Sequence, residues 1–569
     1  MTGLNSVKSR SELAHYLNIP PSKITYILFK RGVDSYYTEF EIPKKSGDPR
    51  RICAPNGDLK DVQRQLADVL WEHQKSVYEE LGIKPNISHA FEEGKSIITN
   101  AKIHRNKRFV VNVDLKDFFD SIHIGRVCGF FEKNKHFALP HEVAVTIAQL
   151  ACYKGKLPQG APTSPIITNL ICQVLDIHLL SLAKRYRLDY TRYADDMTFS
   201  TNDKTFLEKW DSFYAELEKK VIKAGFSINE KKTRVIFRDS KQVVTGLVVN
   251  KKISVDHAYY RKVRAMAHSL YTNGSYSIDG IEGNVRQLEG RFAFIDQIEK
   301  YNNICDSTGK HNAFTLNGRE RQYQQFLFYR YFFDIEKPLI VTEGKTDIRY
   351  IKAALRNLYS EYPELVEKDA NGKFIYKVNF FKRSKRFKYL FDLALDGADS
   401  LTYLYNHFVS NGKDNRTNYL DYFLRITQRV PRYPVIFVYD NEITNSKKPL
   451  SKFANHAKLD SDQRAALGKN LFLRLTPCGN LFLLTNPLTE GREESEIEHM
   501  FTEETRGIEL GGKTLSLESK FDSTKFFGKD HFSNYVLANY ASIDFGGFRP
   551  FLDAMKMVIK AYEKAKTEK

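Results

Sequence analysis

The hydrophobic pattern of the first 80 residues predicts helices on both sides of a basic hairpin. Apolar residues recur at helical spacing over residues 10–17 and 59–78, which is the period of an amphipathic helix. Between them, the strand-like residues 39–42 precede a group of cations and a second strand-like position at Ile52. We expect the cations of this hairpin to meet phosphate groups.

Two strand patterns follow, and each brings carboxylates to its end. Residues 107–113 form an apolar, β-rich run that ends in Asp114. Residues 191–200 form two short strands folded about Asp195 and Asp196. A helix is predicted over residues 166–185 because Pro165 is suited to a helix start.

The hydrophobic pattern is different in the second half of the chain. Residues 259–330 are helical in pattern and rich in arginine, lysine, tyrosine and phenylalanine. A new apolar strand then opens after Lys337 and Pro338, which suggests a domain boundary near residue 335. Strand-like runs beyond it alternate with helical ones, which is typical of a parallel α/β sheet. The strand-like runs are 339–342, 435–439 and 471–475, and the helical runs are 347–359 and 400–409.

Composition narrows the class of protein. At about 150 residues per domain, the 569 residues correspond to three or four units. The hydrophobic content of 42% indicates a globular protein, and the net charge of +18 makes nucleic acid the first partner to consider. The alternative is a soluble basic surface with no polyanion partner.

The cysteines and the apolar runs bear on location. The six cysteines lie far apart and form no CxxC pair, so neither a structural zinc site nor a disulfide framework is expected. The N-terminus has no apolar core of signal-peptide length, and no run of about 18 apolar residues is present. We therefore expect a protein of the reducing cytoplasm with no membrane partner.

The strand-end aspartates are the first candidate for catalytic chemistry. Adjacent strands can bring Asp114, Asp195 and Asp196 together, and carboxylates this close repel each other unless divalent cations neutralise them. Their hard oxygen ligands suit Mg²⁺. Two such ions lower the pKa of a primer hydroxyl and stabilise both oxygens in nucleotidyl transfer. An exposed Asp-Asp turn is the alternative for the dipeptide alone.

The neighbouring motifs resemble those of reverse transcriptases. Residues 114–122, DLKDFFDSI, resemble the first palm motif, and residues 193–196, YADD, resemble the YxDD signature. Residues 157–165, LPQGAPTSP, resemble the motif between them, and order and spacing match as well. The resemblance implies that Asp114, Asp195 and Asp196 are catalytic metal ligands.

The same resemblance implies a nucleotide-binding set. Phe119 corresponds to the steric gate that excludes a ribose 2′-OH, with core packing as its alternative. Gln159 lies on the loop at the incoming base pair, and Lys232 near the departing pyrophosphate, although it is also simply one lysine in a charged run. Lys45 and Arg51 resemble the cations that hold the triphosphate.

Two further elements resemble those of retron reverse transcriptases. Asn100 and His104 fit the NAxxH element, and Thr245 lies in a VTG element. The resemblance implies nucleic-acid binding by these residues, while local capping or packing is the alternative for Asn100 and His104. Residues 1–325 then resemble a complete enzyme, with fingers and palm to about residue 250 and a helical thumb over about 255–325.

A second carboxylate pattern follows residue 335. Glu343 ends a predicted strand, and the Gly-Lys-Thr after it is not a phosphate loop, because Leu339 stands where that motif needs a glycine. A second strand ends in Asp440 and Glu442, and an acidic stretch follows at 493–498. Acidic tips on neighbouring strands again suit Mg²⁺.

This arrangement resembles a Toprim domain over residues 336–505. The resemblance implies that Glu343, Asp440 and Glu442 are catalytic metal ligands and that Glu498 adds another. The chain departs from the family at Glu442, which stands where a second aspartate is usual. Residues 506–569 are either a helical appendage or the last elements of this sheet.

A basic, aromatic run lies between the two acidic strands. Residues 380–388 interleave five cations with phenylalanines, which suits phosphate contact with base stacking. The candidate nucleic-acid contacts are Lys382, Arg383, Lys385 and Arg386. One exposed helix face over buried phenylalanines is the equal alternative.

The predicted fold class is an α+β right-hand reverse transcriptase of fingers, palm and helical thumb, followed by an α/β Toprim domain with a parallel sheet. The resemblance implies an enzyme that uses dNTPs to copy its cognate structured non-coding RNA into branched multicopy single-stranded DNA (msDNA). It also implies anti-phage defence by a Mg²⁺-dependent nuclease with a nucleic-acid substrate. The alternative makes the second domain a non-catalytic nucleic-acid clamp. Whether copies associate around the RNA–DNA is left open.

Overall fold

The computed structural model describes most of the chain, and its helices and strands form two compact units. The described residues are 3–44, 47–306, 309–395, 397, 401–409, 416–476, 479–489, 491–518 and 520–567. One unit comprises Met1–His257 and the other Ala258–Lys569.

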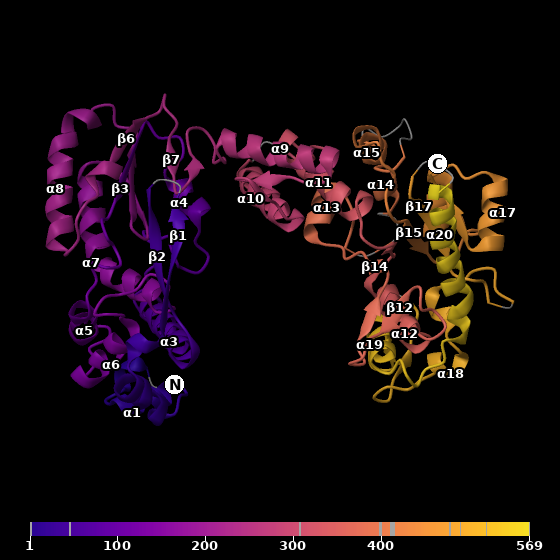
Figure 1. The fold of residues 1–569 in the computed structure, drawn as a ribbon, viewed down its shortest axis with the longest axis horizontal. Helices are drawn as coiled ribbons and strands as arrows, with labels where there is room; N and C mark the ends of the chain where they lie inside the picture. The colour runs from indigo at the N-terminus through magenta and orange to yellow at the C-terminus, as the bar shows by residue number, and fades with distance from the viewer. Residues whose placement is uncertain are drawn as a thin grey trace. The chain divides into compact units, whose positions relative to one another are not determined.

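The first unit combines a two-stranded hairpin, a four-stranded sheet and covering helices (Figure 1). Its helices are α1 (Arg10–Tyr16), α2 (Pro21–Thr25), α3 (Gly57–Glu80), α4 (Ile97–Ile103), α5 (Ile124–Lys133), α6 (His141–Ala151), α7 (Ser164–Arg185) and α8 (Trp210–Lys223). Its strands are β1 (Tyr37–Lys44), β2 (Gly47–Pro55), β3 (Phe109–Asp114), β4 (Asp189–Tyr193), β5 (Asp196–Thr201), β6 (Arg234–Phe237), β7 (Val243–Val244) and β8 (Leu247–Val248).

The four-stranded sheet is antiparallel and has the order β4-β5-β3-β6. Helix α7 packs beside it and is apolar over most of its circumference, as expected of a helix enclosed in a core. It is the one helix among the described residues long and apolar enough to cross a membrane, and 67% of its most apolar stretch is buried. Its composition is therefore accounted for by its place in this core.

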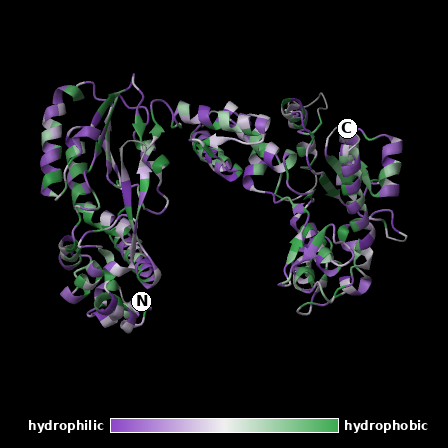
Figure 2. Ribbon diagram, viewed as in Figure 1, coloured by the Kyte–Doolittle hydropathy of each residue, from purple (hydrophilic) through white to green (hydrophobic). Residues whose placement is uncertain are grey.

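Helix α8 shows how a covering helix is patterned. Its buried residues Phe213, Leu217 and Val221 recur every four positions and face the core, while charged residues occupy the outer face. The polar (purple) and apolar (green) residues alternate along this helix in Figure 2.

The second unit begins with three long helices and continues into a five-stranded sheet. Its helices are α9 (His257–Asn273), α10 (Val285–Cys305), α11 (Gly318–Phe328), α12 (Lys345–Asn357), α13 (Lys385–Phe391), α14 (Leu401–Tyr405), α15 (Tyr419–Thr427), α16 (Pro449–His456), α17 (Ser461–Asn470), α18 (Glu503–Arg506), α19 (Lys529–Ala538) and α20 (Arg549–Thr567). Its strands are β9 (Ser277–Ile278), β10 (Ile281–Glu282), β11 (Leu339–Val341), β12 (Val366–Lys368), β13 (Phe374–Tyr376), β14 (Asn379–Phe380), β15 (Val435–Tyr439), β16 (Phe472–Arg474), β17 (Leu481–Thr485), β18 (Thr514–Leu515) and β19 (Phe526–Phe527).

The five-stranded sheet has the order β14-β11-β15-β17-β16. The first four strands are parallel, and only the edge strand β16 is antiparallel. Strands β15 and β17 are buried along their whole length, which explains their continuous apolar sequence. The carboxyl ends of β11 and β15 therefore lie at one edge of the sheet, where ligands gather in open α/β folds.

The units divide after His257, ahead of the boundary near residue 335 that the sequence suggests. The reason is aromatic packing between the segment before residue 335 and the helices after it. The ring centroids of Tyr271 and Tyr329 lie 4.8 Å apart, and each ring also contacts Phe423 of α15. The predicted thumb helices α9–α11 thus belong to the same compact unit as the C-terminal sheet.

The last 64 residues also belong to this unit. Phe532 of α19 and Phe551 of α20 are fully buried in the same hydrophobic core as Ile436 of β15 and Phe482 of β17. The Tyr562 hydroxyl donates to the Pro431 carbonyl at 2.6 Å. Neither of the two possibilities left by the sequence describes this segment: its helices α19 and α20 pack into the core of the unit, and its strands β18 and β19 pair with each other and not with the five-stranded sheet.

Asn480 generates a stability prediction for this unit. Its fully buried side chain donates to the carbonyls of Phe332 (3.0 Å) and Tyr433 (2.9 Å). We expect Asn480→Ala to lower the opening free energy of β15 and β17 by about 1–3 kcal/mol, because two buried carbonyls lose their donor. Amide hydrogen exchange measures this locally. Asn534→Ala, on the exposed face of α19, is the control, and equal protection in both variants would contradict the prediction.

Candidate active sites

Three carboxylates meet at one end of the antiparallel sheet in the first unit. Strands β3 and β5 pair in a register that places Asp114 opposite Asp196. The Leu115 amide donates to the Asp195 carbonyl at 3.0 Å, which fixes the turn beside the end of β3. The structure therefore brings together the three aspartates that the sequence selects.

Burial and mutual repulsion set the electrostatics of this group. Burial, together with the neighbouring carboxylates, raises the pKa of Asp195, and it raises that of Asp196 to about 7. Asp114 is held by Lys232, whose Nζ lies 2.9 Å from its Oδ2, and by Asn229. One lysine against three carboxylates leaves an excess of negative charge on hard oxygen ligands, which fits Mg²⁺.

Two predicted nucleotide-binding residues, Phe119 and Gln159, make contacts within the first unit. Phe119 is half-buried and packs edge-on against Phe118. The Gln159 carbonyl accepts a hydrogen bond from the Cys53 amide at 2.9 Å, so the loop rests on the β1–β2 hairpin. Gly160 has φ +123°, and a Cβ there would lie 2.8 Å from Ile52 Cγ2. This close approach explains the glycine.

The structure describes one of the two residues predicted to bind the triphosphate. Lys45 lies outside the described residues. Arg51 forms an ion pair with Glu39, which also binds Lys154 and Tyr153. These hydrogen bonds lower the pKa of Glu39 to about 2. Arg51 must therefore exchange the Glu39 carboxylate for a phosphate if it is to bind a nucleotide.

A buried ion pair that the sequence analysis missed supports the aspartate turn. Arg192 is fully buried, and its guanidinium donates to both oxygens of Asp176 on α7, at 2.9 and 2.8 Å. The same guanidinium donates to the carbonyl of Ala194 at 3.2 Å. Ala194 has φ +57° in the turn that carries Asp195. Arg192 thus ties a left-handed backbone to the core helix.

The side chains of Asn100 and His104 are fully buried, and their contacts in this structure are with other residues of the first unit. Their role in nucleic-acid binding stays a prediction. His104 bonds Ser200 and Thr191 at 2.8 and 2.7 Å, and Thr191 donates to Asn100 at 2.6 Å. Burial lowers the pKa of His104 to about 3, so it is neutral. These residues join α4 to strands β4 and β5.

Thr245 also makes a structural contact. It is half-buried with φ +46° in the turn between β7 and β8. Its hydroxyl donates to the Ile97 carbonyl at 3.3 Å and so holds this turn against α4. The NAxxH and VTG elements therefore pack against each other.

A second carboxylate group lies at the carboxyl end of the parallel sheet in the other unit. Glu343 follows β11 and Asp440 follows β15, and the Asp440 amide donates to the Glu343 carboxylate at 3.2 Å. Burial, and then the carboxylates beside each of them, raise the pKa of both groups. Asn486 and the Ile497 amide donate to one oxygen of Asp440, at 2.7 and 2.9 Å.

Two further carboxylates complete this group. Asp347, in the first turn of α12, accepts a hydrogen bond from the Gly344 amide at 3.0 Å, and Glu498 is fully buried. Both have a pKa raised by burial. Glu498 was predicted, whereas Asp347 was missed although it stands four residues after Glu343.

A lysine that donates to Glu498 of this group comes from the C-terminal segment. Lys529, the first residue of α19, donates to Glu498 at 3.0 Å and to Glu496 at 2.9 Å. Sequence reasoning missed it because no motif marks it. Glu498 is buried, and Glu343, Asp347 and Asp440 are half-buried. With Lys529, these four carboxylates retain a negative excess, and their oxygen ligands fit Mg²⁺.

Glu442 is buried near Glu343 but is otherwise engaged. Its carboxylate accepts a hydrogen bond from Lys448 at 2.5 Å. A Glu442 oxygen therefore has a cation already, in contrast to Asp440, which has only neutral hydrogen-bond donors on its Oδ1. Glu442 therefore lies beside Glu343 and is bound to Lys448, and we treat it as peripheral to the group that contains Glu343 and Asp440.

Some cations of the basic run 382–386 are bound to other groups of the protein, and others are exposed. Arg383 donates to the carbonyls of Thr342 (2.7 Å) and Ala394 (3.0 Å), so its guanidinium is bound to the main chain. Arg386 pairs with Asp296 and donates to the Tyr323 hydroxyl. Lys382 and Lys385 are exposed. The run is thus partly a structural element and partly an exposed basic surface.

One cysteine does have metal-type neighbours. Ligand atoms of Cys128, Glu132 and His141 lie within 4.8 Å of one another on α5 and α6. The Glu132 carboxylate already bonds both of the other side chains. These contacts are complete without an ion, and we assign the group a structural role.

Comparison with known proteins places the chain in a family. A family model for "Reverse transcriptase (RNA-dependent DNA polymerase)" matches residues 42–264. The retron Ec86 reverse transcriptase of Escherichia coli is 32% identical over 253 residues, which cover 44% of this chain and 75% of that protein. The chain belongs to the retron reverse transcriptase family.

Other relatives in this family match a smaller share of their own length. The retron Mx162 reverse transcriptase of Myxococcus xanthus is 35% identical over 327 residues, covering 52% of this chain. The chain spans 64% of that protein and 61% of the Mx65 enzyme from the same organism. Telomerase from Candida albicans is a structural neighbour with 11% identity, covering 52% of this chain and 60% of that chain. Its TM-score of 0.30 does not establish a shared fold.

The Arg192–Asp176 pair generates a prediction. We expect Asp176→Ala to lower the free energy of unfolding of the first unit by about 3–5 kcal/mol, because the variant leaves a buried guanidinium unpaired. Urea unfolding followed by tryptophan fluorescence measures this, since both tryptophans, Trp71 and Trp210, lie in that unit.

The control for Asp176→Ala removes an exposed ion pair from the same unit. Glu216 pairs with Arg185 at the surface, and Glu216→Ala should change stability by less than about 0.5 kcal/mol. Equal midpoints for the two variants would show that the buried pair carries no special stability.

Proposed function

We propose that this chain is an RNA-directed DNA polymerase that uses dNTPs to copy a cognate structured non-coding RNA into branched multicopy single-stranded DNA. The observation that carries the proposal is the meeting of Asp114, Asp195 and Asp196 at one sheet end, within a reverse-transcriptase match. Family membership supports the retron product, and a structured RNA and its msDNA are the partners.

We assign different roles in nucleotidyl transfer to the candidate residues of the first unit. Asp114, Asp195 and Asp196 would hold Mg²⁺, which supplies charge stabilisation for the attacking and leaving oxygens. Phe119 lies five residues after Asp114, where its ring excludes a 2′-OH. The loop at Gln159 positions the incoming base, and Lys232 is beside Asp114 to meet the leaving pyrophosphate.

We also propose that the second unit carries a Toprim-type, Mg²⁺-dependent nuclease that acts in anti-phage defence in the cytoplasm. Its support is the group formed by Glu343, Asp347, Asp440 and Glu498 at the carboxyl end of a parallel sheet. Glu442 would contribute less to the metal site, because Lys448 occupies one of its oxygens. We propose that the RNA–DNA product restrains this nuclease until phage disturbs it.

The alternative for the second unit is a non-catalytic nucleic-acid clamp. A domain that only binds nucleic acid gains nothing from buried carboxylates, since they repel phosphate. The Glu343 group is built from several elements, and Lys529 is the one lysine of the described residues that donates to its four carboxylates, so the group favours the nuclease over the clamp.

The polymerase is tested by sequencing nucleic acid that copurifies with the chain expressed with its native upstream locus. We expect a short branched DNA with the wild type and none with Asp195→Asn/Asp196→Asn, because the acidic ligands at the reacting oxygens are lost. Primer extension on an added template should fall by at least about 100-fold. Asp211→Asn, an exposed residue of α8, is the control. Wild-type extension by the double variant would exclude this site.

The nuclease is tested with the purified full chain and its copurified RNA–DNA, before and after that RNA–DNA is degraded. We expect Mg²⁺-dependent cleavage of added DNA or RNA only after degradation, and at least about 100-fold less with Glu343→Gln. Glu493→Gln, in the exposed part of the acidic stretch, is the control. If no condition gives cleavage while Glu343→Gln protects cells from phage like the wild type, the nuclease proposal is wrong and the clamp is favoured.

A further inference from the structure

A large cavity in the second unit is separate from the Glu343 carboxylate group. Its volume is about 2030 Å³, and its walls come from α10, from the helical turn Tyr329–Phe333 and from the segment around β14 and α13. Sites for small molecules are commonly about 300–1,000 Å³. The size therefore fits several units of a polymer rather than one small ligand.

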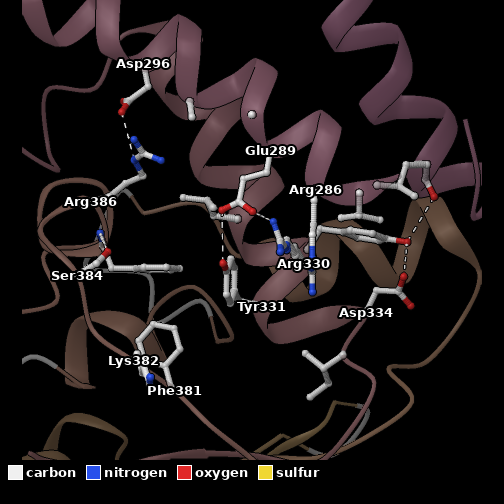
Figure 3. A pocket seen from close by; sticks show the side chains of 18 of the residues that line it. Arg286, Glu289, Asp296, Arg330, Tyr331, Asp334, Phe381, Lys382, Ser384 and Arg386 are labelled. Atoms are coloured by element: carbon white, nitrogen blue, oxygen red, sulfur yellow. Dashed lines mark hydrogen bonds and ion pairs between the residues drawn. The ribbon is translucent and has the colours of Figure 1, made fainter. Parts of the chain in front are cut away.

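Five cations of this cavity have no carboxylate partner among the described residues. They are Arg286, Lys300, Lys382, Lys385 and Arg432, and all five are exposed. Figure 3 shows Arg286 reaching in from α10 and Lys382 on the wall formed by the segment after β14. These positions would let one strand of phosphates contact several cations.

Two of the five acidic residues that line the cavity are neutralised by arginines. Glu289 pairs with Arg330 and Asp296 with Arg386, as the dashed lines in Figure 3 mark. Asp334 accepts a hydrogen bond from the Tyr329 hydroxyl at 3.2 Å. Glu282, Asp334 and Glu336 have no ion-pair partner among the described residues, so three carboxylates oppose the five open cations and the cavity still favours an anionic occupant.

Aromatic rings lie between the cations. Tyr331 is half-buried and meets the rings of Phe381 and Phe387 edge-on, with centroids 6.4 and 5.3 Å away. Phe380, also half-buried, lies on the wall that carries Lys382. Arg330 lies over one face of the Tyr331 ring, 5.1 Å from its centroid, and Lys352 over one face of the Phe380 ring, at 4.9 Å. A flat base that stacks on either ring therefore uses the opposite face.

We infer that this cavity binds a single-stranded nucleic acid, with its phosphates on Arg286, Lys300, Lys382, Lys385 and Arg432 and its bases against Tyr331 and Phe380. Single strands need both features, because phosphate contacts supply affinity and ring stacking accepts any base. A duplex has its bases stacked on each other and cannot use the rings. The inference rests on the proposed function only in taking a nucleic acid as the partner.

The test is photo-crosslinking of the full chain to 12-nucleotide single strands that carry 5-iodouracil, one DNA and one RNA. Mass spectrometry should map crosslinks to the peptides containing Tyr331 or Phe380. Lys382→Glu/Lys385→Glu should weaken binding at this site by about tenfold and lower the slope of log affinity against log salt by about 1.4, for two lost phosphate contacts. A preference for DNA or for RNA identifies the source of the strand.

The matched control is Lys388→Glu/Lys469→Glu, which makes the same charge change at exposed lysines outside the cavity. Three outcomes would overturn the inference: crosslinks confined to residues 1–257, equal weakening in both double variants, or competition by polyglutamate as strong as by the oligonucleotide. Failure of the proposed polymerase is seen separately, as a wild-type chain that extends no primer.

Discussion

Repulsion between carboxylates at strand ends is the constraint on which both units depend. In the first unit, strand register forces Asp114 against Asp196, and the turn between β4 and β5 adds Asp195. A flexible turn would separate these charges. The fully buried Arg192 prevents this by binding the Ala194 carbonyl and both oxygens of Asp176, so the core helix α7 holds the turn in place.

In the second unit, the repulsion between carboxylates is offset by a lysine. Glu343, Asp347, Asp440 and Glu498 lie at the carboxyl end of the sheet, and Lys529 is the lysine that donates to the group. That lysine opens α19, and α19 and α20 share the core of the sheet through Phe532 and Phe551. The C-terminal segment is therefore part of the acidic site, since it carries the compensating charge.

The sequence was sufficient to predict a candidate site residue where an apolar run ends in a carboxylate. Asp114 and Glu343 each end an apolar run, and a strand end at a sheet edge follows from the pattern alone. Lys529 and the Arg192–Asp176 pair could not be predicted, because each depends on residues distant in the chain with no periodic signal. The burial of Asn100 and His104 could not be predicted either, because a motif records residue types and spacing, but not burial.

The domain boundary shows the same limit. Pro338 does punctuate the chain, and a strand does follow it. The segment before it nevertheless packs against later helices, because the rings of Tyr271 and Tyr329 contact the ring of Phe423 in α15. Such contacts between aromatic residues are invisible to a pattern that counts positions along the chain.

The basic run connects the two binding features of the second unit. Lys382 faces the cavity, while the next residue, Arg383, donates to the carbonyl of Thr342, directly before Glu343. The Arg383 charge also lowers the pKa of Glu343, against the effects of burial and of Asp347. Any displacement of residues 382–385 by a strand in the cavity would therefore move a guanidinium that bears on the acidic group. Lys382 of the cavity and Arg383 beside the carboxylate group are thus adjacent in the chain, so a movement of Lys382 can reach the residue whose charge acts on Glu343.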